Sequence, residues 1–307
     1  MKETINSIKA LKKEKDAVIL AHYYVAAEVQ KIADYVGDSY YLSKIANETP
    51  QKVILFCGVS FMGESAKILN PEKTIIMPDA SADCPMAHMI QMNDILLKRA
   101  EYEDLAVVCY INSTAETKAV SDVCVTSSNA IAIVKALPQK NIYFVPDKNL
   151  GTYLSTLLPE KNFIFNEGFC YVHNEIEVGD VEAVLANHPN AKVLVHPECH
   201  MAVIKMADYV GSTAGIIDFA TKNEGLEFII CTEEGIKYKL EQANPNKSFY
   251  FPAPIPLCKD MKKITLKKIE DALKTLDKKI ELNEDLRIKA EKALKRMHEI
   301  AGQSERI

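Results

Sequence analysis

The sequence contains no apolar run long enough to cross a bilayer, and its first residues lack the apolar core of a signal peptide. It also has no stripe of Lys and Arg interleaved with aromatic residues, and its formal net charge is −5 at pH 7. A basic surface of that kind is the usual mark of nucleic-acid binding. These absences predict a cytoplasmic protein whose partners are neither membranes nor nucleic acids.

The eight cysteines include no C-x-x-C pair, so zinc-ribbon and thioredoxin-like folds lose their main support. In a reducing compartment we expect free thiols, metal ligands or catalytic groups rather than disulfides. Cys199 lies where a helix is expected to begin, which can lower the pKa of a thiol, so it is a rival ligand or reactive group. Four cysteines within apolar runs are assigned to the core: Cys57, Cys109, Cys124 and Cys231.

One short pattern, an aspartate followed by apolar residues and then by a hydroxyl residue, occurs three times. It spans residues 34–39, 121–128 and 207–213, and its serines are 88 and 85 residues apart when Ser39, Ser127 and Ser212 are aligned. A fixed period of this length indicates three homologous α/β units. The 307 residues, 48% of them hydrophobic, suffice for several buried cores. We expect units at 1–86, 87–172 and 173–258, followed by C-terminal helices at 259–307.

Short continuous apolar runs, typical of strands buried on both faces, recur in each unit with helical patterns between them. The expected strands are 17–21, 53–57 and 74–79, then 105–110, 122–125 and 141–147, then 191–196, 209–211 and 227–231. Such alternation forms right-handed parallel sheets. The predicted fold class is α/β, with three αβα units that each hold a small parallel sheet. An opening helix over 4–15 and two C-terminal helices, the latter packing back on the core, complete it.

The three repeated serines precede helical patterns at 40–47, 129–137 and 214–223, which places them at or near helix N-caps. Free N–H groups at a helix start favour a phosphate or carboxylate. One such serine is most often only a cap, whereas three in register favour an anion site as much as a cap.

Polar residues also follow the first expected strand of each unit. His22, Tyr110 and His196 are 88 and 86 residues apart. Ligands of open parallel sheets bind beyond the carboxyl ends of the strands. These residues therefore predict one polar cavity where the three units meet.

Three cysteines in expected loops keep the same period. Cys84, Cys170 and Cys258 are 86 and 88 residues apart. Three thiolates from three loops suit a soft metal centre with one open coordination position. An open [4Fe–4S] cluster is the favoured interpretation, and zinc held by three thiolates and a water is the alternative.

Short motifs with little room for chance agreement are spread between residues 21 and 213: AHYY (21–24), VGDS (36–39), DCPMA (83–87), YINST (110–114), TSSNA (126–130), PDKNLG (146–151), HPEC (196–199) and GST (211–213). With these motifs, the sequence resembles the quinolinate synthases, iron–sulfur enzymes of de novo NAD biosynthesis, from about residue 20 to 261. Two flanking positions depart from that pattern. The first motif often reads His-Asn-Tyr where this chain has Tyr23, and a proline is common where it has Tyr171.

The resemblance implies three pseudo-symmetric αβα domains around one [4Fe–4S] cluster held by Cys84, Cys170 and Cys258, with one iron open. It implies condensation of iminoaspartate with dihydroxyacetone phosphate to quinolinate, with loss of phosphate and water. Because iminoaspartate is short-lived in water, we expect an L-aspartate oxidase or dehydrogenase as the upstream enzyme.

Ring closure requires proton removal beside carbonyl and imine groups, so the site needs acids and bases. The candidate catalytic residues are Glu198, Tyr24, Tyr110 and His196. Desolvation is expected to raise the pKa of Glu198 toward the working range, against the helix dipole. The candidate substrate-binding residues are His22, Ser39, Tyr110, Asn112, Ser127, His173, His196, Glu198, Ser212 and Thr213.

Two other functions fit the residues apart from the resemblance. One is a different iron–sulfur reductase or dehydratase of small phosphorylated metabolites. The other is a non-enzymatic sensor that only binds a cluster. A reductase would require an electron donor, and a sensor would need no converging anion sites.

Overall fold

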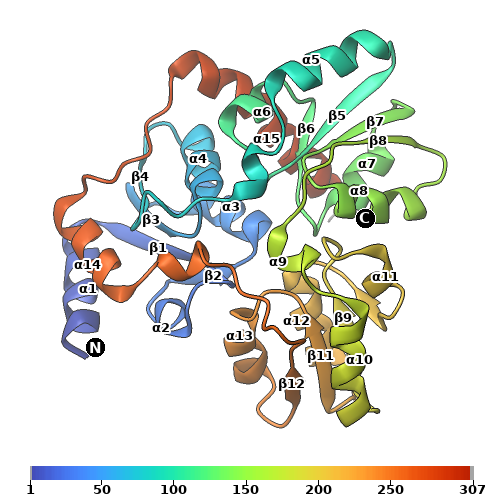
Figure 1. Ribbon diagram of the computed structural model, residues 1–307. Helices are drawn as coiled ribbons and strands as arrows, with labels where there is room; N and C mark the ends of the chain where they lie inside the picture. The colour runs from blue at the N-terminus through green and yellow to red at the C-terminus, as the bar shows by residue number, and fades with distance from the viewer. Residues whose placement is uncertain (1, 305–307) are drawn as a thin grey trace.

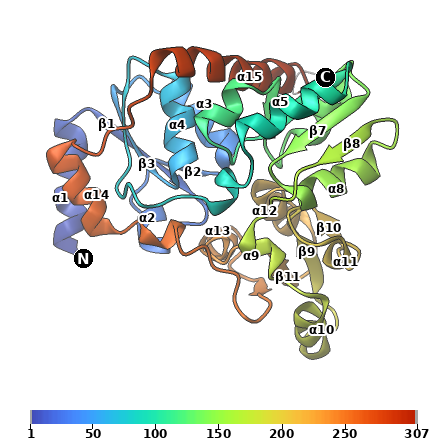
Figure 2. The same ribbon diagram turned by 45° about the horizontal axis from the view of Figure 1, so that its top comes forward.

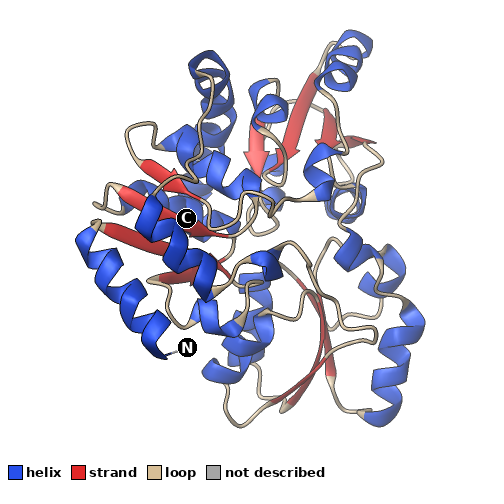
Figure 3. Cartoon of the chain, turned by 60° about the vertical axis from the view of Figure 1, so that its left-hand side comes forward, coloured by secondary structure: helices blue, strands red, loops and turns tan. Residues whose placement is uncertain are grey.

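The computed structural model describes residues 2–304 and contains three four-stranded parallel sheets with helices packed around them (Figures 1 and 3). The α/β class with three αβα units is thereby confirmed. Each sheet has the same order, with its second strand at one edge, then the first, third and fourth. None of the helices within 2–304 is long and apolar enough to cross a membrane.

The strands of the three sheets have the following bounds. The first sheet contains β1 (Ala17–His22), β2 (Tyr35–Gly37), β3 (Val53–Cys57) and β4 (Thr74–Ile76). The second contains β5 (Leu105–Tyr110), β6 (Val123–Val125), β7 (Asn141–Val145) and β8 (Asn162–Phe165). The third contains β9 (Lys192–Val195), β10 (Tyr209–Val210), β11 (Glu227–Cys231) and β12 (Ser248–Tyr250).

The helices connect these strands in chain order. Before and around the first sheet lie α1 (Lys2–Glu14), α2 (Ala27–Gln30), α3 (Ser39–Glu48), α4 (Ser60–Leu69) and the 3-10 turn η1 (Pro85–His88). Around the second lie α5 (Met92–Glu101), α6 (Ala115–Ala119), α7 (Ala130–Ala136), α8 (Lys148–Leu157) and α9 (Tyr171–Asn174). Then come α10 (Val178–Asn187), α11 (Met201–Ile204), α12 (Thr213–Lys222), α13 (Ile236–Ala243), the turn η2 (Met261–Lys263), α14 (Leu266–Thr275) and α15 (Glu284–Ser304).

The repeated aspartate has the same structural task in each sheet. The carboxylate of Asp34 accepts a hydrogen bond from the backbone N–H of Ile19 at 2.9 Å, and its own N–H donates to the Ile19 carbonyl at 2.9 Å. Asp122 makes the same pair with Val107, and Asp208 with Val193. Each tie joins the start of the second strand to the middle of the first, which explains why the pattern recurs.

The sequence predicted three strands per unit, and the structure has four. The missed strands are β2, β8 and β12, all at sheet edges. An edge strand is short and covered on fewer sides, so it needs no continuous apolar run. By contrast, every residue of β1 and β5 is buried, and both were predicted from such runs. Each predicted unit contains one sheet, and the boundaries at 86, 172 and 258 stay predictions.

The two C-terminal helices hold different parts of the molecule. The first, α14, packs against α1, as expected of a helix that returns to the start of the chain. The second, α15, packs against α4 of the first unit and against α6, α7 and β6 of the second. Figure 2 shows α15 lying across both units. Its buried stripe includes Ala290, Ala293, Leu294 and Met297, so α15 fixes the first two units relative to each other.

Truncating this stripe should loosen that contact. We expect Leu294→Ala to lower the free energy of unfolding by about 2–5 kcal/mol, since Leu294 is fully buried and leaves a cavity. Ile288 lies on the same helix and is 43% exposed, so Ile288→Ala should change stability by at most about 0.5 kcal/mol. Urea unfolding of both variants measures this, and equal losses would contradict the bridging role of α15.

Candidate functional site

A cavity lies where the three units meet. The carboxyl ends of the first strands open into it, because β1 ends at His22, β5 ends at Tyr110 and His196 follows β9. Most of the predicted site residues line this cavity. They are His22, Tyr24, Ser39, Cys84, Tyr110, Asn112, Ser127, Cys170, His173, His196, Glu198, Thr213 and Cys258.

Two histidines at the ends of first strands are held in the same way. The Nδ1 atom of His22 accepts the backbone N–H of Tyr24 at 3.2 Å, and Nδ1 of His196 accepts that of Glu198 at 3.4 Å. Each neutral ring therefore carries its proton on Nε2, and Nε2 of His196 lies 3.3 Å from the hydroxyl of Ser127. Burial lowers the pKa of both histidines to about 3. The cavity thus gains two neutral N–H donors.

The three repeated serines occupy different positions at their helix starts. Ser212 is the N-cap of α12, but it does not belong to the residues that line the cavity. Asp38 caps α3, so Ser39 is the first helical residue. Asn129 is the N-cap of α7, two residues beyond Ser127. The serine hydroxyl is thus the cap only at Ser212, whereas Ser39 and Ser127 lie on the cavity wall.

Glu198 is the centre of the polar contacts. Tyr110 donates its hydroxyl to one carboxylate oxygen at 2.5 Å, and Nδ1 of His173 lies 2.8 Å from the other. The ring of His173 stacks on that of His196 at 4.5 Å. Glu198, Tyr110 and His173 are all buried or nearly so, so these hydrogen bonds form away from water.

The expected rise in the pKa of Glu198 is wrong. Burial does raise it, but the adjacent His173 and His196, with the hydrogen bonds from His173 and Tyr110, outweigh burial and lower the pKa to about 2. Glu198 is therefore a carboxylate at neutral pH. Burial, with the charge of Glu198 next, raises the pKa of Tyr24 and of Tyr110 well above the ordinary value, so both hydroxyls keep their protons.

The cysteines divide into two groups by exposure. Cys84, Cys170 and Cys258 are partly exposed and line the cavity, each following the fourth strand of its sheet. The other five are buried. Cys199 is one of these five. Burial raises the pKa of its thiol, so the expected lowering by a helix start does not occur, and the thiol contacts the Cys231 carbonyl. The thiols that face the cavity are therefore those of the period-keeping cysteines, which are the three that recur every 86 to 88 residues: Cys84, Cys170 and Cys258.

Acidic side chains hold the backbone at two of these three cysteines. Asp83 accepts the N–H of Cys84 at 2.8 Å, and Glu233 accepts that of Cys258 at 3.0 Å. These two loops are thus fixed through the main chain, which leaves their thiols free of these hydrogen bonds.

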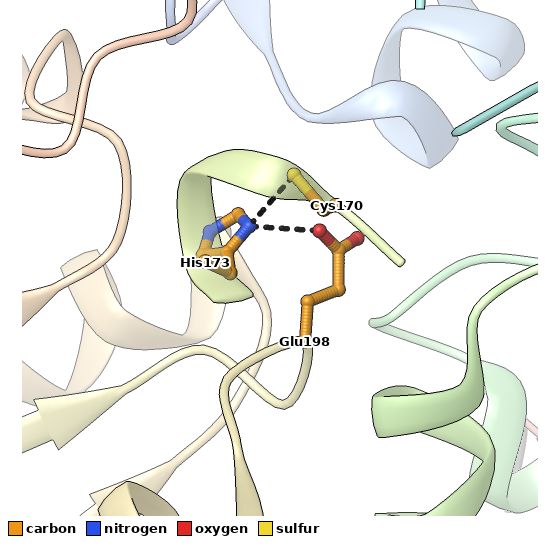
Figure 4. A group of neighbouring side chains, drawn as sticks. All are labelled: Cys170, His173 and Glu198. Atoms are coloured by element: carbon orange, nitrogen blue, oxygen red, sulfur yellow. Dashed lines mark hydrogen bonds and ion pairs between the residues drawn. The ribbon is translucent and has the colours of Figure 1, made fainter. Parts of the chain in front are cut away.

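A compact group that could hold a single metal ion overlaps this set at one position. Ligand atoms of Cys170, His173 and Glu198 lie within 4.8 Å of one another (Figure 4). The Cys170 thiol lies 3.3 Å from Nδ1 of His173. This arrangement differs from the predicted three cysteines, but thiolates that bind different irons of one cluster stand farther apart than ligands of one ion. Both sets share Cys170.

Sequence reasoning did not single out Thr232 and Glu233. Both are fully buried and follow β11 directly, so they occupy the carboxyl end of a third strand. The rule that located His22 and His196 at first strands would have found them if it had been applied to every strand. Glu233 also pairs with Lys262 at 2.9 Å, and Lys262 donates to the Tyr24 carbonyl at 2.8 Å.

Comparison with known proteins gives one consistent match. Residues 6–299 fit the family described as "Quinolinate synthetase A protein". A quinolinate synthase of Fusobacterium nucleatum is 54% identical, over 96% of this chain and 98% of that protein. Those of Clostridioides difficile and Caldicellulosiruptor bescii are 49% and 51% identical, over 98% and 96% of this chain and 99% and 97% of their own lengths.

The two classes of cysteine should differ in alkylation rate. In native protein prepared without iron, iodoacetamide should modify Cys84, Cys170 and Cys258 before the buried five, because access limits the reaction. Cys109 provides the internal test, since its buried thiol has a pKa lowered to about 7 by hydrogen bonds and by Lys118 against the effect of burial. Peptide mass spectrometry over a time course measures the order. Early labelling of Cys109 would contradict control by access.

Proposed function

The chain belongs to the quinolinate synthase family, enzymes of NAD biosynthesis, and from this premise we propose that it condenses iminoaspartate with dihydroxyacetone phosphate to quinolinate, with loss of phosphate and water. The observation that carries the proposal is the match over nearly the whole chain together with a cavity whose wall presents the three period-keeping thiols. A cluster-binding sensor would not need the neutral donors that converge beside them.

The donor set fits a cluster with three protein ligands. Cys84, Cys170 and Cys258 come from three separate loops, and each is partly exposed to the same cavity. We propose that they hold a [4Fe–4S] cluster whose fourth iron has no cysteine. When bound, that iron would supply a Lewis acid that polarises a substrate oxygen and helps water to leave without net redox change. His173, beside Cys170, would support the ligand or contact substrate.

Neutral donors would bind the carboxylates and the phosphate. Ser39 lies in the first turn of α3, where N–H groups and the helix dipole favour an anion. Ser127 of the second unit and His196 of the third unit form another polar pair. Asn112 would make the opposite kind of contact, because its buried side-chain oxygen accepts from no partner among the described residues. A substrate N–H or O–H group would satisfy that oxygen.

The acid and base groups would be Glu198, Tyr24, Tyr110 and His196. As a carboxylate, Glu198 accepts protons and fixes the direction of two donors, Tyr110 and His173. Tyr24 and Tyr110 keep their phenolic protons and can donate them to developing negative charge on substrate oxygens. Burial of this set keeps water away from the reactive imine.

The place of the reaction follows from its substrate. Iminoaspartate hydrolyses quickly in water, so an enzyme that oxidises L-aspartate, an oxidase or a dehydrogenase, would have to supply it. We place the reaction in the cytoplasm, where thiols stay reduced and free to bind a metal.

The test of the proposal is anaerobic reconstitution with iron and sulfide, followed by a quinolinate assay on the same sample. We expect the starting chain to bind iron and form quinolinate, and Cys170→Ser to lose both. Cys57→Ser is the matched control, because Cys57 is buried in β3 away from the cavity and should keep its iron. Full iron and turnover in Cys170→Ser would refute the ligand assignment.

Glu198→Gln should retain the fold and iron but lose roughly 10²–10⁴-fold in turnover. An amide offers one acceptor oxygen, so it cannot accept from both Tyr110 and His173 as the carboxylate does. The matched control is Glu270→Gln, which alters a carboxylate of α14 that pairs with Lys274 outside the cavity. Single-turnover assays under argon, with cluster absorbance recorded, decide the matter. Near-normal turnover in Glu198→Gln would return Glu198 to a structural role.

A further inference from the structure

Thr232 joins two residues of the cavity wall without lining the cavity itself. It follows β11 and is fully buried. Its hydroxyl lies 2.8 Å from the hydroxyl of Tyr24 and 2.8 Å from Nε2 of His173. Those two residues are 149 positions apart in the sequence, and their rings lie 6.3 Å apart. The Thr232 side chain thus connects Tyr24, which follows β1, with the segment that contains Cys170 and His173.

When the His173 ring is neutral, the surroundings fix the direction of these hydrogen bonds. His173 directs Nδ1 at the carboxylate of Glu198, which only accepts, so in the neutral ring Nδ1 carries the proton. Nε2 is then an acceptor, and the hydroxyl of Thr232 must donate to it. Because the single hydroxyl proton of Thr232 is donated to His173, its oxygen accepts a hydrogen bond from the hydroxyl of Tyr24. Tyr24 in turn receives the hydroxyl proton of Thr213 at 2.8 Å.

The result is one ordered series of hydrogen bonds that runs from Thr213 through Tyr24, Thr232 and His173 to Glu198. Among these five described residues, Thr232 is the only one that does not line the cavity. Other buried hydroxyls, such as those of Ser65 and Ser113, donate to nearby backbone carbonyls and hold only local structure. Thr232 instead contacts two side chains that face substrate space, and its branched Cβ restricts the hydroxyl to few orientations.

We propose that Thr232 is a positioning residue for the condensation, holding the Tyr24 hydroxyl and the His173 ring in the orientations that the reaction uses. This inference rests on the proposed function, because it assigns a task within that reaction. Without the hydroxyl, Nε2 of His173 would be a buried acceptor with no donor, and Tyr24 would keep only Thr213. Both side chains would then be free to turn away from the substrate.

The first arm of the test is kinetic. Thr232→Val, nearly isosteric, should lower kcat roughly 10–100-fold with KM little changed, because Thr232 does not touch substrate. Thr232→Ser restores the hydroxyl and should recover most of kcat. Thr117→Val is the matched control, since Thr117 is also buried but lies in α6 outside the cavity, and it should keep full kcat. Normal kcat in Thr232→Val would overturn the proposal.

The second arm does not depend on activity. In iron-free protein labelled with ¹⁵N-histidine, the His173 signals are identified by their loss in His173→Gln. We expect Nε2 to give the shift of a hydrogen-bonded acceptor, and to move toward that of a free acceptor in Thr232→Val. A protonated Nε2 in the starting chain, or an unmoved signal in the variant, would overturn the proposal.

The two arms separate this inference from the proposed function. If the starting chain forms no quinolinate, the proposed reaction fails, while the histidine spectra still show whether Thr232 positions His173. If the chain is active and Thr232→Val is too, the reaction stands and the positioning role is wrong. Should Thr232→Val not fold, Thr232→Ala makes the same comparison against Thr232→Ser.

Discussion

The tie between a repeated aspartate and the first strand of its sheet is the constraint from which the rest of the site follows. Asp34, Asp122 and Asp208 each exchange two hydrogen bonds with the middle of that strand. The tie sets the register in which the second strand begins. Three residues or so later the chain leaves the sheet and enters a helix at the cavity. Because all three units obey the same constraint, the residues after their first and second strands have equivalent positions in each unit.

Within the cavity, the buried carboxylate of Glu198 orders its neighbours. A carboxylate without partners would be costly to bury, and here Tyr110 and His173 supply the donors that offset the cost. The same bonds give direction to the donors. His22 and His196 are oriented differently, by backbone N–H groups at Nδ1. Carboxylate and backbone together leave the histidine tautomers little freedom, so the wall is organised before a substrate arrives.

Periodicity in the sequence predicted the features that repeat, and it could not predict those that do not. The three units, the strand-end residues and the division of the cysteines all follow an 85 to 88 residue spacing. Edge strand β8 was missed because its residues are only partly covered. The shift in the pKa of Glu198 was predicted in the wrong direction. Burial of this side chain could be expected from the sequence, whereas its contact with His173 could not. The hydrogen-bond partners of Thr232 do not belong to the repeated motif of its unit. Only the folded structure therefore reveals its hydrogen bond with Tyr24.

The cavity wall also carries a consequence for how anions would be held. No Lys or Arg belongs to the described residues that line it, and Lys262 pairs outside it with the Tyr24 carbonyl, Glu233 and Glu234. Recognition of carboxylate and phosphate would then depend on hydroxyls, neutral imidazole N–H groups and the start of α3. Such donors bind an anion by geometry more than by charge, so an ion is held less tightly than by a cation. In the proposed reaction, which would release phosphate, weak binding of the leaving ion would favour its departure.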